Sequence, residues 1–199
     1  MKLLLFSDLH RDKEAAAELV EKSKQADVIV GAGDFAVCRQ GVTDCIEVLK
    51  HCQCPAVLVA GNGESAEELT EACADWPTAH VLHGESATVA GVEFFGIGGG
   101  IPVTPFGSWS WDFTEEDAQR LLTDCPHGCI LVSHSPPQGL VDVTSRGEHK
   151  GSSAVRSAIE RCRPRVVVCG HIHDSWEKEE NLDATRVINA GPRGIQISL

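Results

Sequence analysis

Short hydrophobic runs recur along this chain, and each stops at a small residue that is followed by polar side chains. Each run has the length and the content of β-branched residues that are typical of a buried strand. The five clearest runs occupy residues 3–10, 28–34, 56–62, 129–134 and 166–173. The pattern therefore predicts five buried strands that end next to polar residues.

Segments with apolar residues at helical spacing separate these runs. The predicted helices span residues 13–25, 41–51, 65–74 and 115–124, and a fifth begins after residues 152–153. Asp12 can cap the first helix, and the pair Thr114 and Asp117 resembles a capping box at the start of the fourth. Because the early strands alternate with helices, we expect parallel strands joined by right-handed crossovers.

The region after about residue 79 has shorter apolar runs and tight turns. These runs predict a local antiparallel meander of strands. The last two apolar segments, 185–191 and 194–199, predict a final pair of strands. The whole pattern is that of an α/β protein.

The longest irregular segment, residues 96–113, carries the aromatic side chains Phe106, Trp109 and Trp111. Long loops without secondary structure are usually functional or disordered, and these aromatic residues disfavour disorder. One interpretation is that the loop forms a pocket wall, with an aromatic ring stacking on a base or an aryl leaving group. The other is that the rings plug the edge of the core or form a dimer contact.

Potential metal ligands follow all five predicted strands. In an open α/β sheet the carboxyl ends of the strands form the ligand-binding edge, so these side chains should converge there. They are Asp8, His10, Asp34, Asn62, His134, His171 and His173. Turn formation would explain Asp34 or Asn62 alone. The recurrence of ligand types after five strands favours a site for two divalent metal ions.

The ligand types restrict the metal and its chemistry. Carboxylate oxygen and imidazole nitrogen without thiolate suit Mn, Fe, Zn, Ni or Co, and we expect Mn²⁺. Two ions about 3.5–4 Å apart form a clamp for in-line displacement at phosphorus and lower the pKa of a bridging water. Asp34 is the natural candidate for a bridging carboxylate. The sequence thus indicates a metallohydrolase.

The motifs SDLH (7–10), GAGD (31–34), GNGE (61–64), SHSPP (133–137) and GHIH (170–173) resemble, in this order, the signature of the calcineurin-like metallophosphoesterases. The resemblance implies a four-layer α-β-β-α sandwich of two mixed β-sheets, built as one domain over residues 1–199. It implies a phosphoesterase in which a metal-bridging hydroxide attacks phosphorus in line. Asn62 and His134 would also help to hold the phosphoryl oxygens.

The resemblance also implies how the ligands divide between the two ions. Asp34 would bridge them. The first ion would be held by Asp8, His10, Asp34 and His173, and the second by Asp34, Asn62, His134 and His171.

One position departs from the family signature. The family usually has a histidine after Gly-Asn that protonates the leaving group or binds a phosphoryl oxygen, and Gly63 stands there instead. General acid catalysis contributes about 10²–10⁴-fold, and its loss matters least for acidic leaving groups. We therefore expect a phosphodiesterase. The alternatives are a phosphomonoesterase or protein phosphatase, and a metal-binding, non-catalytic scaffold of the same fold.

Other side chains could assist at the site. Glu64, His83 or His149 could replace the missing acid. Cationic donors to a phosphate could come from Arg146, His149 and Lys150, near a predicted helix start that also favours anions, or from Arg11 or Arg193. Each of these has the alternative role of a solvated surface residue.

Composition narrows the substrate class. The net charge of −12 argues against binding of polymeric nucleic acid, whereas a small phosphate ester, for example a nucleotide, can be drawn to a locally positive metal site. No apolar run approaches the roughly 18 residues of a membrane span, and no secretion signal precedes the first motif. Nine cysteines without a recognisable zinc motif indicate reduced thiols. We expect a cytoplasmic protein with no membrane partner, and the oligomeric state stays open.

Overall fold

The computed structural model describes residues 1–199 and contains two β-sheets. The strands of the first sheet are β1 (Lys2–Phe6), β2 (Val28–Ala32), β3 (Ala56–Val59), β4 (Ala79–Val81) and β11 (Ile195–Ser198). Those of the second are β5 (Glu85–Val89), β6 (Val92–Ile97), β7 (Ile130–Ser133), β8 (Val166–Cys169), β9 (Glu179–Leu182) and β10 (Thr185–Asn189). The strand orders are β11-β1-β2-β3-β4 and β5-β6-β7-β8-β10-β9.

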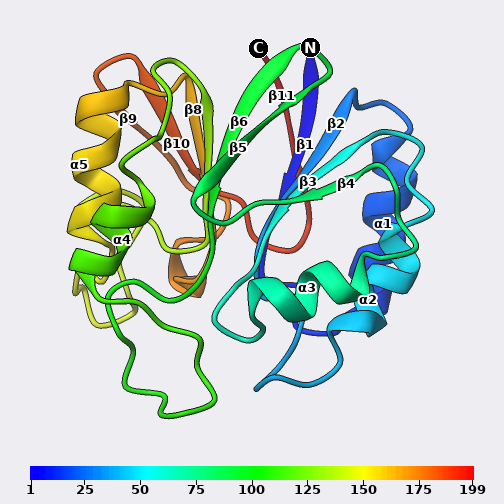
Figure 1. Ribbon diagram of the computed structural model, residues 1–199, viewed down its shortest axis with the longest axis horizontal. Coiled ribbons are helices and arrows are strands. Elements are labelled where there is room, and N and C mark those ends of the chain that lie inside the picture. Colours follow the sequence, from blue (N-terminus) through cyan, green and yellow to red (C-terminus); the bar gives the residue numbers. More distant parts are fainter.

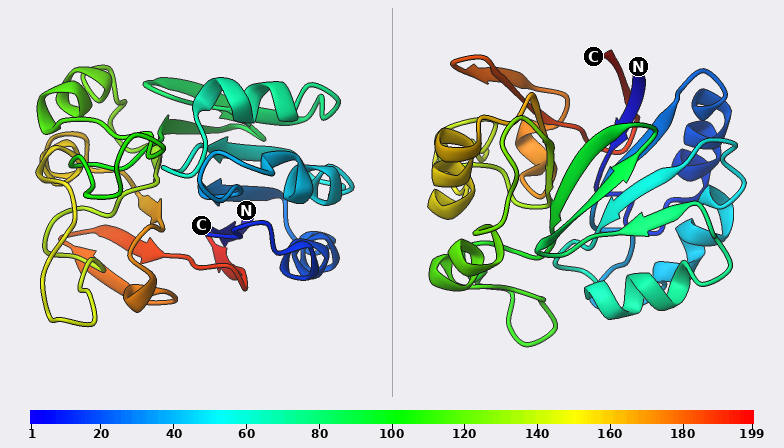
Figure 2. Two further views of the ribbon diagram at one scale, coloured as in Figure 1. Left: turned by 90° about the horizontal axis from the view of Figure 1, so that it is seen from below. Right: turned by 45° about the horizontal axis from the view of Figure 1, so that its top comes forward.

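Five helices cover the outer faces of these sheets (Figure 1). The first sheet carries α1 (Lys13–Ser23), α2 (Val42–Leu49) and α3 (Ala66–Ala72), and the second carries α4 (Glu115–Leu121) and α5 (Ser153–Cys162). A short 3₁₀ turn, η1 (His173–Ser175), follows β8. The sheets face each other between the two helical layers (Figure 2). This is the predicted four-layer α-β-β-α sandwich.

The alternation of side chains along β1 shows how the layers are held together. Leu4 and Phe6 pack into the cluster beneath α1–α3, whereas Leu3 and Leu5 point into a second cluster between the two sheets. Because successive residues of a strand face opposite sides, a strand that is apolar on both faces must lie between two layers. The continuous apolar runs of the sequence reflect this burial.

Both sheets are mixed, as predicted. In the first sheet only β11 is antiparallel to its neighbour, and in the second the antiparallel pairs are β5 with β6 and β9 with β10. All five strands predicted from the hydrophobic runs are confirmed, namely β1, β2, β3, β7 and β8. Their carboxyl ends lie at the bottom of the molecule in Figure 1.

The helix caps follow the sequence signals. Asp12 accepts a hydrogen bond from the Ala15 N–H at the start of α1, and Thr114 accepts one from the Asp117 N–H at the start of α4. Ser65 and Glu68 form a complete capping box on α3. All four helices with a predicted end stop two or three residues earlier than predicted: α1 at Ser23, α2 at Leu49, α3 at Ala72 and α4 at Leu121.

Two of the predicted strand pairings are wrong. β5 and β6 form the expected hairpin, but β4 pairs in parallel with β3, because the chain crosses from one sheet to the other after β4. The Leu82 N–H bonds to Leu58 O in the first sheet, and the Gly84 N–H bonds to Gly96 O in the second. The final pair is also wrong: β10 lies in the second sheet beside β9, and β11 pairs with β1 in the first.

The cysteines are all free thiols, and only Cys38 is exposed. Cys129 and Cys169 are buried and act as small apolar residues, as predicted. None of the helices has both the length and the apolar character that crossing a membrane requires.

Candidate metal centre

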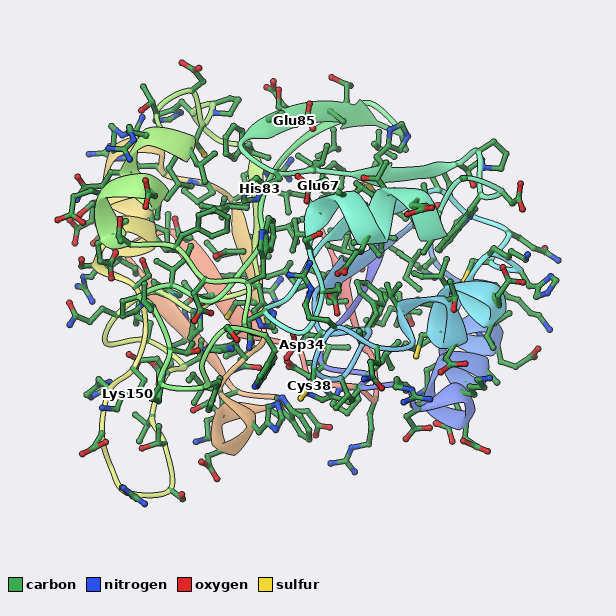
Figure 3. All side chains as sticks on the ribbon, turned by 60° about the horizontal axis from the view of Figure 1, so that its bottom comes forward. Asp34, Cys38, Glu67, His83, Glu85 and Lys150 are labelled. Atoms are coloured by element: carbon green, nitrogen blue, oxygen red, sulfur yellow. The ribbon has the colours of Figure 1, made fainter.

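The seven predicted ligand residues converge on one rim, where the strands of both sheets end. Asp8, His10, Asp34 and Asn62 follow strands of the first sheet, and His134, His171 and His173 follow strands of the second. Five of these side chains line a cavity of about 390 Å³, namely His10, Asp34, Asn62, His171 and His173. Asp8 and His134 are buried behind them. Figure 3 labels Asp34 near the middle of this face.

Four of the seven form a tight group. One ligand atom from each of Asp8, His10, Asp34 and His173 lies within 4.8 Å of all the others. The Nε2 atoms of His10 and His173 are 3.1 Å apart, and His10 Nε2 is 3.6 Å from Asp34 Oδ2. This set is the one that the family resemblance implies for the first ion.

The other residues gather on the opposite side of Asp34. His134 Nε2 lies 3.5 Å from Asp34 Oδ1 and 3.2 Å from Asn62 Oδ1. The rings of His134 and His171 are 4.9 Å apart between centroids. Each carboxylate oxygen of Asp34 therefore faces a different group, which is the placement that a bridging ligand needs.

Backbone carbonyl groups orient two of the imidazoles. His134 Nδ1 is 2.8 Å from Ala32 O, and His10 Nδ1 is 3.3 Å from Ala36 O. A carbonyl oxygen can only accept a hydrogen bond, so the ring proton lies on Nδ1 and the lone pair of Nε2 faces the centre. The donor set thus fits divalent metal ions in the way that metal-ligating histidines usually do.

Burial keeps further imidazoles neutral. It lowers the pKa of His171 to about 3 and lowers the pKa of His173, whereas for His134 the charges of Asp34 and Asp8 outweigh burial and raise the pKa. Burial alone would raise the pKa of Asp34, but His134, His10 and the Gly63 N–H outweigh it, so this pKa lies below the usual value. Neutral imidazoles and an ionised carboxylate are the forms that bind metal.

The backbone is strained at this rim. Four of the seven residues have a left-handed φ: Asp8 (55°), His10 (47°), Asp34 (58°) and His171 (67°). Such conformations are uncommon outside glycine and cluster at functional sites, where the surrounding structure holds them. This observation supports a functional role for the rim independently of residue type.

Asp8 is held by neighbours that the sequence analysis missed. Its Oδ2 accepts hydrogen bonds from Ser7 Oγ at 2.6 Å and Trp176 Nε1 at 2.9 Å, and its Oδ1 accepts one from the His171 N–H at 3.0 Å. The Trp176 ring also packs on His173, with centroids 4.4 Å apart. No periodicity or motif marks Trp176, because its role depends on the path of the chain after β8.

Asn62 is oriented by the long loop before α4. Its Nδ2 donates to Ser110 Oγ at 2.9 Å, and Ser110 Oγ donates to Asp112 Oδ1 at 2.7 Å. The amide oxygen of Asn62 is therefore the atom left facing His134. Ser110 and Asp112 are positioning residues that sequence reasoning also missed.

The three candidates for a substitute acid do not line the cavity. Glu64 is buried and accepts hydrogen bonds from the N–H groups of Ala36 and Gly61, and burial with the charge of Asp34 raises its pKa to about 7. His83 packs against Trp111 and Phe113. His149 Nδ1 lies 2.5 Å from Asp142 Oδ1. Glu64 braces the two loops that carry Asp34 and Asn62.

Gly63 has little room for a side chain. A Cβ atom there would lie 2.9 Å from Ala36 O and 3.2 Å from Asp34 Oδ1, and the Gly63 N–H donates to Asp34 Oδ1 at 2.8 Å. A histidine at this position therefore requires the loop that carries Asp34 to shift.

The predicted cationic donors are mostly engaged elsewhere. Arg11 pairs with Asp44, and Arg193 pairs with Glu177. The N-terminus of α5, expected to favour an anion, is already occupied by a carboxylate of the protein. Glu115 accepts hydrogen bonds from Ser152 Oγ and from the N–H groups of Ser153 and Ala154. Lys150 lines a neighbouring cavity, whereas none of these arginines, nor Arg146, lines the cavity at the metal centre.

Some aromatic residues of the long loop form a pocket wall, and one packs at the edge of the core. Phe106 and Trp109 line the metal-centre cavity. Trp111 instead packs at the edge of the core, between His83 and Phe113.

Comparison of the chain with known proteins identifies its family. The model of the calcineurin-like phosphoesterase superfamily domain matches residues 1–196. The protein TT1561 from Thermus thermophilus has a similar structure, with a TM-score of 0.77 at 20% identity, over 96% of this chain and 90% of that one. No curated protein sequence matches the chain.

Two further similar structures are those of phosphatases. A dimetal phosphatase from Danio rerio has a TM-score of 0.62 at 13% identity, over 96% of this chain and 88% of that one. A purple acid phosphatase from yellow lupin has a TM-score of 0.58 at 11% identity, over 98% of this chain and 44% of that one. These likenesses concern the fold, while the family model covers nearly the whole chain. The chain belongs to the calcineurin-like phosphoesterase superfamily.

Proposed function

We propose that this protein hydrolyses small phosphodiesters at a centre of two divalent metal ions. The observation that carries the proposal is the position of Asp34, with one carboxylate oxygen toward His10 and the other toward His134. The family membership supports metal-dependent hydrolysis of phosphoric esters. The preference for diesters, the ions and the roles of individual residues are part of the proposal.

The ligand sets follow the two groups described above. Asp8, His10, Asp34 and His173 would hold one ion, and Asp34, Asn62, His134 and His171 the other. When bound, two such ions lower the pKa of a water and neutralise the charge that develops on the phosphoryl oxygens. We propose Mn²⁺ from among Mn, Fe, Zn, Ni and Co, all of which suit oxygen and imidazole ligands without thiolate.

The chain contributes orientation around that centre. The carbonyl groups of Ala32 and Ala36 fix the faces of His134 and His10, and Ser110 fixes the amide of Asn62. Asn62 would thereby present its amide oxygen to an ion, and Asn62 and His134, which lie beside each other, would help to hold a phosphoryl group. Asp8 is held in place by three hydrogen bonds.

The proposed preference for diesters rests on the missing proton donor. Gly63 cannot protonate a leaving group, and Glu64, His83 and His149 lie outside the cavity. Substrates with acidic leaving groups lose least from this absence. We further propose that the protein acts as one domain in the cytoplasm, which its nine free thiols support.

Hydrolysis of two chromogenic esters tests the proposal. After EDTA treatment and addition of Mn²⁺, the protein should hydrolyse bis-p-nitrophenyl phosphate faster than p-nitrophenyl phosphate. Asp34→Asn should lower the rate by more than the roughly 10–100-fold that is typical of residues outside the ligand shell. The control Asp124→Asn changes an exposed aspartate that does not line the metal-centre cavity and should leave the rate unchanged.

Two outcomes would contradict the proposal. Faster hydrolysis of the monoester would favour a phosphomonoesterase. Mn²⁺ binding without hydrolysis of either ester would favour a scaffold role for the same fold.

A further inference from the structure

A second cavity opens beside the metal centre. It has a volume of about 250 Å³ and shares Phe106, Thr144, His171 and Ile172 with the metal-centre cavity. Its other lining residues are Pro102, Val103, Thr104, Pro105 and Lys150. We call this cavity the side groove. Because the two cavities share four residues, a small molecule can extend from one into the other.

The lining of the side groove is mostly hydrocarbon. The molecule exposes only three large hydrophobic side chains, Val37 (40%), Val103 (60%) and Phe106 (51%), and two of them lie in this groove. A scattered exposed hydrophobic residue needs no explanation. Two that sit together at the mouth of a polar cavity match the usual composition of a small-molecule pocket, with apolar walls and a few polar groups.

The wall that carries Phe106 is firmly held. Asp112 accepts hydrogen bonds from the N–H and the hydroxyl of Thr104, and the Ile101 N–H donates to Ser135 Oγ. The Phe106 ring stacks on Trp109, with centroids 5.7 Å apart and planes 12° apart. Phe106 therefore has one face against Trp109, and the residue remains 51% exposed.

The opposite wall is anchored as well. Buried Asp142 accepts hydrogen bonds from the N–H groups of Gly139 and Gly151, at the two ends of the segment that carries Thr144 and Lys150. The Ser145 N–H donates to Asp174. Figure 3 shows Lys150 on this segment, to one side of Asp34. Lys150 is the one charged residue that lines the groove, and its ammonium group lies 3.1 Å from Glu148.

We propose that the side groove binds a flat aromatic group, a nucleobase or an aryl ring, of a phosphoester whose phosphoryl group lies at the metal centre. Phe106 stacks on that ring and acts as a specificity-determining residue. Because Lys150 already has a carboxylate partner, the groove favours an uncharged ring. The inference rests on the proposed function and adds the substrate class to it.

Binding of two non-hydrolysable phosphonates tests this proposal without turnover. Calorimetry on the Mn²⁺-loaded protein would compare phenylphosphonate with methylphosphonate, which differ in the ring and share the phosphonate head. We expect the wild type to bind phenylphosphonate about tenfold more tightly, which is the scale of one stacked ring. In Phe106→Ala this ratio should fall to about one, and Phe106→Leu should lie between the two.

Phe106 is 51% exposed, so its replacement should leave the fold intact, and the affinity for methylphosphonate, which has no ring, gives the reference value for each variant. Val37→Ala is the matched control, since Val37 is exposed and lines neither cavity. Equal affinities of the wild type for the two phosphonates would overturn the proposal. An unchanged ratio in Phe106→Ala would overturn it too.

A metal-independent experiment separates this proposal from the proposed function. If neither phosphonate binds, the proposed metal centre fails, and saturation-transfer NMR with phenol and with adenosine still tests the groove. Transfer to the ring protons of either compound in the wild type, and its loss in Phe106→Ala, would support the groove and show which ring it prefers. Absence of transfer with both compounds would overturn it.

Discussion

The orientation of one amide group illustrates how remote segments determine the metal centre. Asn62 lies after β3, but the atom that accepts its Nδ2–H is Ser110 Oγ, from the loop before α4. An asparagine presents either oxygen or nitrogen to a neighbour, and only the oxygen binds a cation. Ser110 therefore selects the orientation that Asn62 would need as a ligand of the proposed centre.

Removal of that hydroxyl should weaken metal binding. We expect Ser110→Ala to lower the affinity for the more weakly bound of two Mn²⁺ ions by roughly 10–100-fold, as for other residues that orient a ligand. Calorimetric titration of the metal-free protein measures both affinities. Ser108→Ala, on the same loop and without a side-chain hydrogen bond in the structure, is the control. Two unchanged affinities in Ser110→Ala would refute the positioning role.

The side chain of His83 should make the stability of the fold depend on pH. Its Nδ1 accepts a hydrogen bond from the Gly98 N–H, which requires an unprotonated nitrogen, and burial lowers the pKa of His83 below 6.5. The unfolded chain therefore binds a proton more readily than the folded one. The contribution of neutral His83 is fully present above pH 6.5 and is lost as the pH falls through the folded pKa.

Denaturant unfolding at several pH values measures this effect. Between about pH 7.5 and pH 5 the wild type should lose more stability than His83→Gln, which cannot be protonated. His80→Gln, at an exposed histidine on β4, should follow the wild type. If the stability of wild type and of His83→Gln changed with pH in the same way, His83 would have the same pKa in the folded and the unfolded state, which would contradict the prediction.

At the scale of the elements, the local sequence pattern is sufficient to predict the strands that are buried on both faces. The apolar runs of β1, β2, β3, β7 and β8 could be predicted because each is covered on both faces and contains no polar alternation. The starts of α1, α4 and α5 could also be predicted, because Asp12, Thr114 and Ser152 cap these helices through contacts within one turn.

The pairing of strands with partners far along the chain could not be predicted in this way. β9 (Glu179–Leu182) lies at the edge of the second sheet and contains a single apolar residue, Leu182, so it has no hydrophobic pattern that would predict a strand. β4 and β11 do have such signals, but the sheet that each joins depends on where the chain crosses between layers. Pairing is a property of the tertiary fold, and the sequence pattern specifies it only for neighbouring hairpins.

For the whole molecule, the convergence of the seven candidate ligands could be predicted from topology alone. Parallel strands bring their carboxyl ends to one edge, and the two facing sheets bring two such edges together. The sequence did not indicate the residues that hold these ligands and their loops in position. Trp176, Ser110 and Glu64 act through hydrogen bonds to residues or loops far away in the sequence or on another segment.

In the same architecture, ions at the proposed centre would link the two sheets. Asp8, His10 and Asp34 follow β1 and β2 of the first sheet, whereas His173 follows β8 of the second. The proposed sites exist only when both sheets are in place, so ions would bind the folded state and not the unfolded chain. Metal removal should therefore lower the stability of the whole fold.

Thermal unfolding with EDTA or with excess Mn²⁺ measures the link. A ligand at about 100 times its Kd stabilises the folded state by about 2.7 kcal/mol per site, which corresponds to a rise in Tm of roughly 5–10 °C for a chain of this size. Asp34→Asn should lose most of this rise because Asp34 serves both groups, and Asp124→Asn should keep it. If Asp34→Asn gained as much stability from Mn²⁺ as the wild type, the ions would be binding elsewhere. Asp34 would then have no part in joining the two sheets through metal.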